Sequence, residues 1–371
     1  MRRPVAPLVP RLDLSGRNTL GLRSRASYGG VLADESELIA AAQFADRMGL
    51  PFHMLGCGSK CVLVEKIDAV LEIACVRDRR LQHVGGGVRV TARAGETWDD
   101  IVRWTVGRGF GGLENLAGIP GTAGAAPIQN IGAFGVELSD LAEGIDVIDT
   151  ADWKARRLAA AECGFGYRKS RFKDDPGRFL VTGVTLYLPA KSHPVLSLEG
   201  LSGCVSSNGQ AKVMTAVLAR RRARLPDWWV TGNAGSFFHN PVVPVAATAR
   251  IPDVCSQRVP GGVKLPAVKM LDLCRFFGHG RGGADFFATN ALVLVNAGGA
   301  TLGKVDALAA RAQDAVRLPF GVVLVKKPSR VANSGPIGGP NCSSQCCLLW
   351  RQVLKFVFPG LNSHAGWFSS L

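Results

Sequence analysis

The sequence predicts an α+β protein with more than one domain, because its 371 residues exceed the usual length of a single domain. Apolar residues recur at helical spacing over 34–50, and the short apolar segment 51–56 follows directly. Residues 86–95 alternate between apolar and polar side chains, which is typical of a strand with one buried face. An apolar segment at 290–299 precedes a second helical pattern after Thr301. Helices and strands are therefore expected in every part of the chain.

The first part of the chain is expected to start with a helix over 34–50. Acidic residues occupy its first turn, and Leu38, Ile39, Ala42 and Ala45 share one face. A strand at 51–56 should follow, and then the turn "GCGSK" at 56–60. Two more short strands are expected within 61–76.

The second part is expected to contain the strand 86–95 and a helix. Thr97 is placed to cap this helix, whose apolar residues are Ile101, Val102 and Trp104. The segment 109–135 then consists mostly of Gly, Ala and Pro with few charges. Two interpretations stay open: a buried connection, or backbone wrapped around a flat ligand. A strand at 178–189 follows, although its alternation is lost in the middle.

The third part should contain the strand 290–299, a helix and a closing strand at 321–325. Thr301 is placed to cap the helix. The residues expected on its buried face are Val305, Leu308, Ala309, Ala312 and Val316.

Composition narrows the class of protein. The net charge of +15 favours anionic partners, but the densest basic run is "ARRRARLP" at 219–226. We therefore expect a basic surface or a small anionic ligand rather than nucleic acid. No apolar run approaches the roughly 20 residues of a membrane helix, and the N-terminus has no clean signal-peptide pattern. The protein is expected to be cytoplasmic. The ten cysteines show no zinc-ligand spacing, so no metal is expected.

Four stretches carry residues suited to chemistry. The "GCGS" turn at 56–59 exposes backbone N–H groups that suit a phosphate. Gln129 and Asn130 suit the polar edge of a heteroaromatic ring, or else satisfy a turn. The pair Tyr167–Arg168 suits a carboxylate or phosphate, or else is an ordinary exposed pair. Ser236, within "TGNAGSFFHNP", is either a turn residue or a reactive hydroxyl.

Together these stretches closely resemble the flavin-dependent UDP-N-acetylenolpyruvoylglucosamine reductase family of peptidoglycan synthesis. The resemblance extends from about Asn18 to Leu324. It rests on "NTLGL" (18–22), "GCGS" (56–59), "GLENLAGIPGTAGAAPIQNIGAFGVEL" (112–138), "FGYRKSRFK" (165–173), "LPD" (225–227), "GNAGSFFHNP" (232–241) and "NALVLVN" (290–296).

The resemblance implies a fold and a reaction. The fold is a two-subdomain FAD-binding unit of the PCMH and vanillyl-alcohol-oxidase type, followed by a C-terminal α/β substrate-binding domain. The implied boundaries are an N-terminal extension (1–17), FAD-binding subdomains (18–82 and 83–226), a substrate-binding domain (227–324) and a divergent basic tail (325–371). NADPH reduces non-covalently bound FAD, and the enolpyruvyl sugar nucleotide is then reduced to UDP-N-acetylmuramate. The protein is expected to be a monomer.

The resemblance also assigns residues. Ser236 matches the proton donor, Arg168 the carboxylate-binding arginine, and Tyr167 a substrate contact. Arg224, Asn240 and Asn290 match further substrate contacts. The residues implied for the cofactor are Gly56, Gly58, Ser59, Ile119, Pro120, Gly121, Gln129, Asn130 and Gly135.

Three departures from the family pattern stand out. Lys60 replaces the usual asparagine after the glycine turn, where it would face a pyrophosphate or solvent. Leu198 stands where part of the family has a substrate-binding tyrosine. Lys327 stands where the family has a glutamate that assists protonation, and we expect this to impair turnover while FAD binding survives.

The tail after Leu324 contains no Asp or Glu. We interpret it as the product of a reading-frame change, with a genuine divergent extension as the alternative. Two other functions stay open: an FAD-linked oxidase with the same flavin-binding unit, and a non-catalytic basic binding protein.

Overall fold

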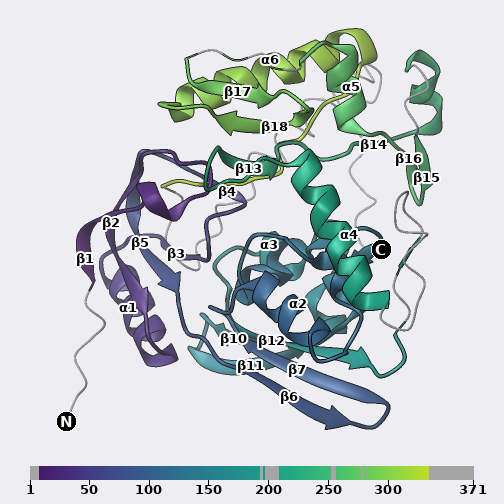
Figure 1. The fold of residues 1–371 in the computed structure, drawn as a ribbon. Coiled ribbons are helices and arrows are strands. Elements are labelled where there is room, and N and C mark those ends of the chain that lie inside the picture. Colours follow the sequence, from purple (N-terminus) through teal and green to yellow (C-terminus); the bar gives the residue numbers. More distant parts are fainter. Residues whose placement is uncertain are drawn as a thin grey trace, which may run out of the picture.

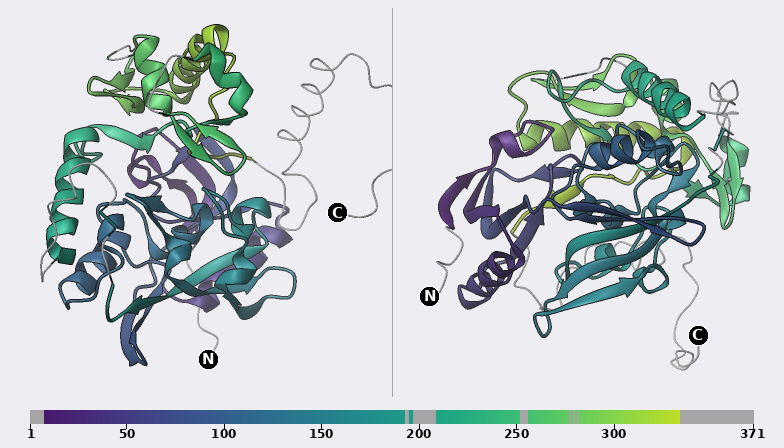
Figure 2. Two further views of the ribbon diagram at one scale, coloured as in Figure 1. Left: turned by 90° about the vertical axis from the view of Figure 1, so that its right-hand side faces the viewer. Right: turned by 60° about the horizontal axis from the view of Figure 1, so that its bottom comes forward.

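Four β-sheets of three or more strands organise the described part of the molecule: one in the first region, one in the second and two in the third (Figure 1). The structure is a computed structural model that describes residues 8–192, 195–196, 209–251, 256–276, 278, 280 and 282–333. Two further views show the third region, the green part of the chain over residues 232–320, at one end of the molecule (Figure 2).

The first sheet has the strand order β1-β2-β5-β3. Its strands are β1 (Val9–Asp13), β2 (Arg25–Leu32), β5 (Lys66–Ala74) and β3 (Phe52–Leu55). Strands β2, β5 and β3 run parallel, and α1 (Glu35–Arg47) connects β2 to β3. Asp34 caps α1 by accepting hydrogen bonds from the N–H groups of Ser36 and Glu37. The predicted helix and strands are thus confirmed, but 1–17 is no mere extension, because β1 pairs with β2.

The second sheet is antiparallel, with the order β11-β10-β12-β7-β6. Its strands are β6 (Arg79–Val84), β7 (Gly87–Arg93), β10 (Ala142–Asp149), β11 (Lys154–Ala159) and β12 (Phe179–Pro189). Strand β12 is central and buried along nearly its whole length, which explains why its alternation is lost. The boundary predicted between 82 and 83 is wrong, since it cuts through β6.

Helix α2 (Trp98–Val106) packs on the second sheet with Trp98, Ile101 and Val102 in the core. Thr97 does occupy the N-cap position, but its side chain makes no capping hydrogen bond. Two shorter helical elements, η6 (Ala160–Cys163) and α3 (Arg171–Asp174), lie between β11 and β12.

The glycine-rich segment 109–135 forms a series of short turns. Its elements, with those that directly follow, are η2 (Glu114–Leu116), η3 (Ala123–Ala125), η4 (Pro127–Gln129), β8 (Gly132–Ala133), β9 (Val136–Glu137) and η5 (Leu138–Asp140). Leu113, Leu116 and Ala123 are fully buried in the core of the second sheet. Part of this segment is therefore a buried connection.

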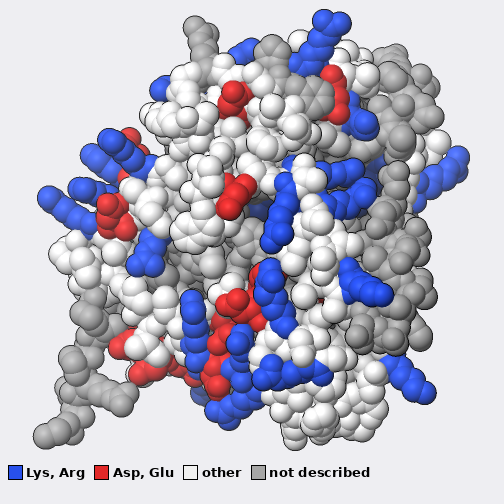
Figure 3. Space-filling view, in the orientation of Figure 1, with Lys and Arg blue, Asp and Glu red and all other residues white. Residues whose placement is uncertain are grey.

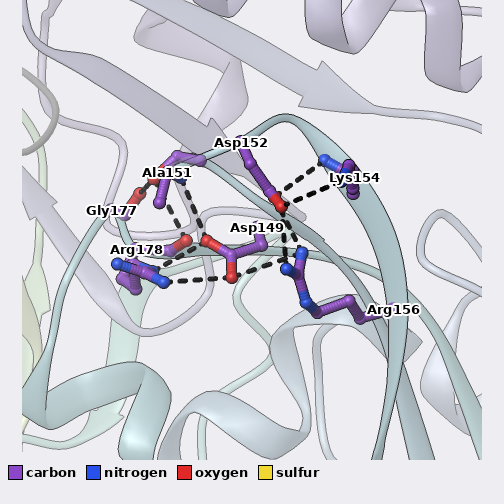
Figure 4. Close-up of polar contacts among 8 residues, drawn as sticks. Asp149, Ala151, Asp152, Lys154, Arg156, Gly177 and Arg178 are labelled. Carbon is purple, nitrogen blue, oxygen red and sulfur yellow. Dashed lines mark hydrogen bonds and ion pairs between the residues drawn. The ribbon is translucent and has the colours of Figure 1, made fainter.

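An ion-pair cluster fixes the turn between β10 and β11 (Figure 4). The buried carboxylate of Asp149 accepts hydrogen bonds from Arg178 Nη2 and from the N–H of Ala151, both at 3.0 Å. Arg156 forms two hydrogen bonds to Asp152, at 2.7 and 2.8 Å. All these groups pair with one another, so the cluster has a structural role.

The third region contains two small sheets and two helices. The sheets are β13-β18-β17 and β14-β16-β15. Their strands are β13 (Gly232–Ser236), β18 (Asn290–Asn296), β17 (Ala284–Phe287), β14 (Val242–Val243), β16 (Gly262–Lys264) and β15 (Gln257–Val259). The helices are α5 (Ala267–Leu273) and α6 (Leu302–Phe320), and the short η7 (Val245–Arg250) follows β14.

Helix α6 confirms the predicted pattern. Thr301 accepts a hydrogen bond from the N–H of Lys304, and all five residues predicted on the apolar face are buried. Helix α4 (Gly209–Arg224), which leads into this region, was not predicted.

The strand predicted at 321–325 is wrong. Gly321 ends α6 with a left-handed φ of 67°, and the chain then runs on to β19 (Ser329–Val331). Strand β19 pairs in parallel with β4 (Cys61–Leu63) of the first region, so residues 325–333 belong to the fold rather than to a divergent tail. Residues 334–371 lie outside the described part of the chain.

Candidate active site

Two glycine-rich loops from different regions meet at the candidate site. The hydroxyl of Ser59 donates a 2.7 Å hydrogen bond to the carbonyl oxygen of Pro120. Gly58 has a φ of 60°, and a Cβ there would lie 2.2 Å from the carbonyl oxygen of Arg17. Gly121 has a φ of 150°. Neither glycine can be replaced without strain, so the loops present main chain rather than side chains, which suits a ligand held by backbone N–H groups.

A third loop, around Gln129, Asn130 and Gly135, lies beside the second of these. The side-chain amide of Asn130 donates to Glu137, Ser139 and the carbonyl of Gly166, and its oxygen accepts from the N–H of Ser139. The expectation that this amide reads the edge of a ring is therefore wrong, because the protein already uses it. Gln129 makes no such bond within the described residues and stays open to a ligand.

Tyr167 and Arg168 lie at the tip of a tight turn. Gly166 and Lys169 close the turn with two backbone hydrogen bonds, at 3.1 and 3.0 Å. The guanidinium carbon of Arg168 lies 5.1 Å from the centroid of the Tyr167 ring, and Lys264 Nζ of β16 lies 3.9 Å from that centroid. Tyr167 thereby links the second and third regions by cation–π contacts.

The guanidinium of Arg168 is partly held by protein acceptors. Its Nη1 donates to the carbonyl oxygen of Asn130 and to Glu137 Oε1, both at 3.1 Å, and its Nη2 donates to the carbonyl of Gly132. Burial raises the pKa of Glu137, although Arg168 acts to lower it. A guanidinium has five N–H groups, so two remain free of these acceptors. Two N–H groups are what a bidentate carboxylate contact needs.

Ser236 ends β13 beside a β-bulge. Strand β13 pairs with β18 in register at Asn233↔Val295 and again at Ser236↔Val293, so two residues of β13 face one of β18. Gly235, within the bulge, has a left-handed φ of 62°. Bulges of this kind redirect side chains next to active sites. The Ser236 hydroxyl has no protein partner in the described chain.

Lys60 reaches this bulge from the end of the glycine turn. Its Nζ donates to the carbonyl oxygens of Ala234 and Ser236, each at 2.6 Å. Lys60 thus faces neither a pyrophosphate nor solvent, and both sequence-based alternatives for it are wrong.

Positive charges from all three regions act on one another in the part of the molecule where Lys60 contacts Ser236. Burial, followed by the charge of Lys327 and then of Arg168 and Arg221, holds the pKa of Lys60 well below its usual value. Burial, with Arg168 and Arg221 next, lowers the pKa of Lys327 to about 8. Burial lowers the pKa of Arg221 to about 10. We call Lys60, Arg168, Arg221, Lys264 and Lys327 the cation cluster. The positive charges of the cation cluster repel one another, and a bound anion would reduce this repulsion.

The pKa of His239 is lowered by burial and, in addition, by members of the cation cluster together with Lys173. Burial, followed by the charges of Lys327 and Lys173, lowers its pKa to about 4. Its backbone N–H donates to the carbonyl oxygen of Val325, which places it beside the segment that carries Lys327. The imidazole is therefore neutral near pH 7.

The predicted substrate contacts Asn290 and Asn240 have side-chain partners within the protein, and Arg224 takes part through its backbone. Asn290 Nδ2 donates to the carbonyl oxygen of Arg224, whose side chain is exposed. Asn240 Oδ1 accepts from the N–H of Ala267 at the start of α5. The structure thus brings Asn290 and Arg224 together, and leaves the Arg224 guanidinium open to a ligand. Leu198 lies outside the described residues.

Sequence reasoning missed part of the cation cluster. Arg221 lies in the basic run 219–226, from which only Arg224 was selected. Its Nε donates to the carbonyl oxygen of Gly118, at 3.0 Å. Val213 and Val217 of α4 are buried, and Arg221 continues their four-residue spacing, so helical periodicity is the signal that would have found it. Lys264 had no comparable signal, because its contact with Tyr167 is tertiary.

Two clefts lie away from this cluster. One, of about 460 Å³, is lined by residues from 15–21, 228–232 and 296–299, none of which is charged. The other, of about 420 Å³, lies against β1 and β2 and includes Arg11 and Asp68. Neither contains a predicted site residue. In the described part of the chain no group of His, Cys, Asp and Glu is placed to hold a metal ion, and no helix there is long and apolar enough to cross a membrane.

Basic side chains elsewhere are spread over the surface. Figure 3 shows them on several parts of one face, mixed with acidic side chains in its lower part. This face carries no single basic stripe of the kind that binds nucleic acid.

Comparison with known proteins decides the family. Residues 31–158 match the FAD binding domain family, and residues 227–331 match the C-terminal domain of UDP-N-acetylenolpyruvoylglucosamine reductase. The reductase of Burkholderia ambifaria is 40% identical over 335 residues, covering 86% of this chain and 96% of that protein. The chain belongs to the UDP-N-acetylenolpyruvoylglucosamine reductase family. The reductase of Pseudomonas aeruginosa is also 40% identical, over 87% of this chain and 98% of that protein.

Family membership confirms the resemblance and the fold class. The crystal structure of the Thermus caldophilus reductase matches with a TM-score of 0.64 and 24% identity, over 87% of this chain and 98% of that one, which supports the shared fold. The match to the family's C-terminal domain extends to residue 331. The resemblance therefore does not end at Leu324 as predicted, and Lys327 lies inside the family domain. The reading-frame change after Leu324 is not tested by these matches and stays a prediction.

Proposed function

We propose that the protein reduces the enolpyruvyl ether of UDP-N-acetylenolpyruvoylglucosamine to UDP-N-acetylmuramate in peptidoglycan synthesis, with NADPH as the reductant. The observation that supports this most is the cation cluster, which combines residues from three regions of the chain and contacts Ser236 through Lys60. The substrate carries a carboxylate and a diphosphate, and these anions suit such a cluster.

The residues present fit FAD as the cofactor. Gly56, Gly58 and Ser59 face Ile119, Pro120 and Gly121, and a Cβ on Gly56 would lie 2.5 Å from Thr122 Oγ1. Backbone approach of this kind suits a pyrophosphate. Gln129, the backbone of Asn130 and Gly135 would hold the ring system. When bound, FAD supplies the hydride that NADPH has delivered to it and that the β-carbon of the enol ether receives.

Ser236 is the proposed proton donor to the α-carbon. Its hydroxyl has no protein partner in the described structure, so it is available to a substrate. A serine is a weak acid, and it can act only where donors already stabilise the developing negative charge. The two free N–H groups of Arg168 suit the substrate carboxylate, over which that charge spreads.

The other substrate contacts follow from the same arrangement. Tyr167 is half-exposed and held between Arg168 and Lys264, so its hydroxyl is open to a ligand. Arg224 suits the diphosphate, and Asn240 and Asn290 retain polar groups for the sugar nucleotide. Lys327 takes the place of the family's glutamate, so we propose that proton transfer is impaired in this chain.

A visible spectrum of the purified protein tests the proposal. A flavin absorbance band should bleach with NADPH and recover anaerobically when the enolpyruvyl substrate is added. The variant Ser236→Ala should bleach at a similar rate but recover about 100-fold more slowly or more, which is the usual contribution of a general acid. The matched control is Ser329→Ala, an exposed serine on β19. Failure of the flavin to recover in the parent protein, even after hours, would contradict the proposed activity.

The family relationship favours this function over the FAD-linked oxidase and the basic binding protein. The proposed site of action is the cytoplasm, where the nucleotide substrates are found, and the proposed state is a monomer. Gel filtration with light scattering measures that state directly.

A further inference from the structure

Lys60 makes an unusual contact for a lysine next to a glycine turn. Its ammonium donates to two main-chain carbonyls, those of Ala234 and Ser236, across 174 and 176 residues of sequence. Within the described chain, no Asp or Glu lies within ion-pair distance of it. A buried cation without a carboxylate is costly unless its hydrogen bonds are well made. The two hydrogen bonds that the Lys60 ammonium makes therefore indicate a functional role.

The two carbonyls flank the bulge that precedes the catalytic serine. Gly235 lies between them with a φ of 62°, and a Cβ on Gly235 would lie 3.6 Å from Lys60 Nζ. The ammonium therefore lies directly under the bulged residue. A donor that holds both carbonyls fixes the direction in which the bulge turns the next side chain.

Other contacts fix the same strand, and one of them also reaches the bulge, because the N–H of Gly235 donates to Asn233 Oδ1 at 2.9 Å. The N–H and carbonyl groups of Asn233 bond to the backbone and side chain of Thr19, at 2.8 and 2.6 Å. Beyond the bulge, the N–H of Phe237 donates to the carbonyl oxygen of Leu292, at 2.7 Å. Both ends of the strand are therefore anchored. Within the bulge, Asn233 holds the N–H of Gly235, and Lys60 holds the carbonyls of Ala234 and Ser236.

The main chain of Lys60 is tied to the segment that carries Lys327. Its carbonyl oxygen accepts a 3.0 Å hydrogen bond from the N–H of Ser329, at the start of β19. Residue 60 thus joins the glycine turn, the serine bulge and the C-terminal segment. A substitution of Lys60 can therefore change the position of the Ser236 side chain without any contact between Lys60 and the substrate.

We propose that Lys60 is a positioning residue for the proposed reduction: its ammonium holds the bulge at Ala234–Ser236 and so aims the hydroxyl of Ser236 at the α-carbon of the substrate. The inference rests on the proposed function, because the role of Ser236 belongs to it. Lys60 itself transfers no proton.

The test compares three variants and one control. Lys60→Met removes both hydrogen bonds but keeps the length of the side chain. Lys60→Gln keeps an N–H donor and replaces Lys60→Met if the latter does not fold. Lys60→Arg keeps charge and donors and should rescue part of the effect. The control, Lys66→Met, removes an exposed lysine from the start of β5.

Hydrogen exchange is the first readout, and it does not depend on turnover. In Lys60→Met, amides of the peptide 232–238 should exchange about 10-fold faster than in the parent, while those of α6 stay unchanged. Lys60→Arg should fall between the two, and Lys66→Met should match the parent. Equal exchange in Lys60→Met and the parent would overturn the inference.

The second readout separates positioning from a general structural role. Recovery of the reduced flavin with substrate should slow about 100-fold in Lys60→Met, since a small misplacement has that effect. The KM for substrate and the rate of bleaching by NADPH should change less than about threefold. Equal slowing of both half-reactions would indicate a structural role and overturn the inference. A parent protein with no recovery contradicts the proposed function instead, while the exchange result still decides whether Lys60 holds the bulge.

Discussion

The backbone N–H of Lys327 donates a 2.8 Å hydrogen bond to the carbonyl oxygen of Phe237, the residue directly after Ser236. The next pair, Phe238 and Lys326, forms an isolated antiparallel bridge. The segment that follows α6 is thereby fixed beside the serine strand. Lys327 thus places a positive charge beside the serine strand, at the position where the resemblance implies a glutamate.

Restoring that carboxylate should restore turnover. In Lys327→Glu, recovery of the reduced flavin with substrate should be about 10- to 100-fold faster than in the parent, because an acid-base partner for Ser236 returns. Anaerobic stopped-flow absorbance measures this rate. The control Lys326→Glu makes the same change of charge at the neighbouring residue, which pairs with Asp306 at 2.7 Å. It should not increase the rate of flavin recovery. An unchanged or slower rate in Lys327→Glu would show that the lysine is not what limits proton transfer.

Lys327 should make stability depend on alkaline pH. Its pKa is lowered from 10.5 to about 8 by burial, with Arg168 and Arg221 adding to the effect. Between these values the unfolded chain binds more protons than the folded one, so the free energy of unfolding rises with pH. Urea titrations near pH 8 and near pH 10.5 should show a smaller rise in Lys327→Met, by about 1–2 kcal/mol after allowance for partial exposure. Equal rises in both proteins would contradict the lowered pKa.

His239 should report on anion binding. Its pKa is lowered to about 4 by burial and by the charges of Lys327, Lys173, Lys60 and Arg168. A bound anion offsets these charges, so the pKa should rise by about 1 pH unit or more. Proton NMR titration with and without UDP-N-acetylmuramate measures it, and His239→Gln identifies the resonance. A pKa that stays the same when the product is bound would place the anion outside the cation cluster.

Arg168 should not tolerate a conservative change. Arg168→Lys keeps the charge but cannot both hold the carbonyls of Asn130 and Gly132 and present a planar pair of N–H groups. We expect kcat/KM for the enolpyruvyl substrate to fall by about 100- to 1,000-fold. Arg171→Lys, on an exposed face of the same segment, is the matched control. A loss below about threefold in Arg168→Lys would argue against a bidentate contact with the substrate.

Local patterns predicted the elements whose burial repeats along one face. Helix α6 is the clearest case, since its capping threonine and all its predicted apolar contacts are confirmed. Helix α4 escaped prediction because its long polar segment has only a few buried residues. The strand predicted at 321–325 failed for a different reason. Its residues after Gly321 are all apolar, but the structure assigns no strand there, and the nearest pairing is the isolated bridge between Lys326 and Phe238.

In the candidate site, too, some residues were predicted from the sequence and others were corrected by the structure. Motif identity assigned Ser236, Arg168 and the glycine turn, because each motif is continuous in sequence. The structure corrected Asn130, whose amide is used up within the protein, and Lys60, whose ammonium points at the serine bulge. These corrections concern side-chain direction, which a one-dimensional pattern does not contain.

By itself, the sequence determined the family resemblance and the order of the motifs, and it predicted a change of charge at Lys327. Only the tertiary structure decided which charges meet. Lys60, Arg168, Arg221 and Lys327 come from distant parts of the chain. Besides burial, the charges of Arg168 and Arg221 lower the pKa of both lysines, and the charge of Lys327 lowers that of Lys60. Electrostatic coupling depends on distance and burial rather than on sequence separation. The cation cluster, and the role proposed for Lys60 within it, therefore emerged only from the fold.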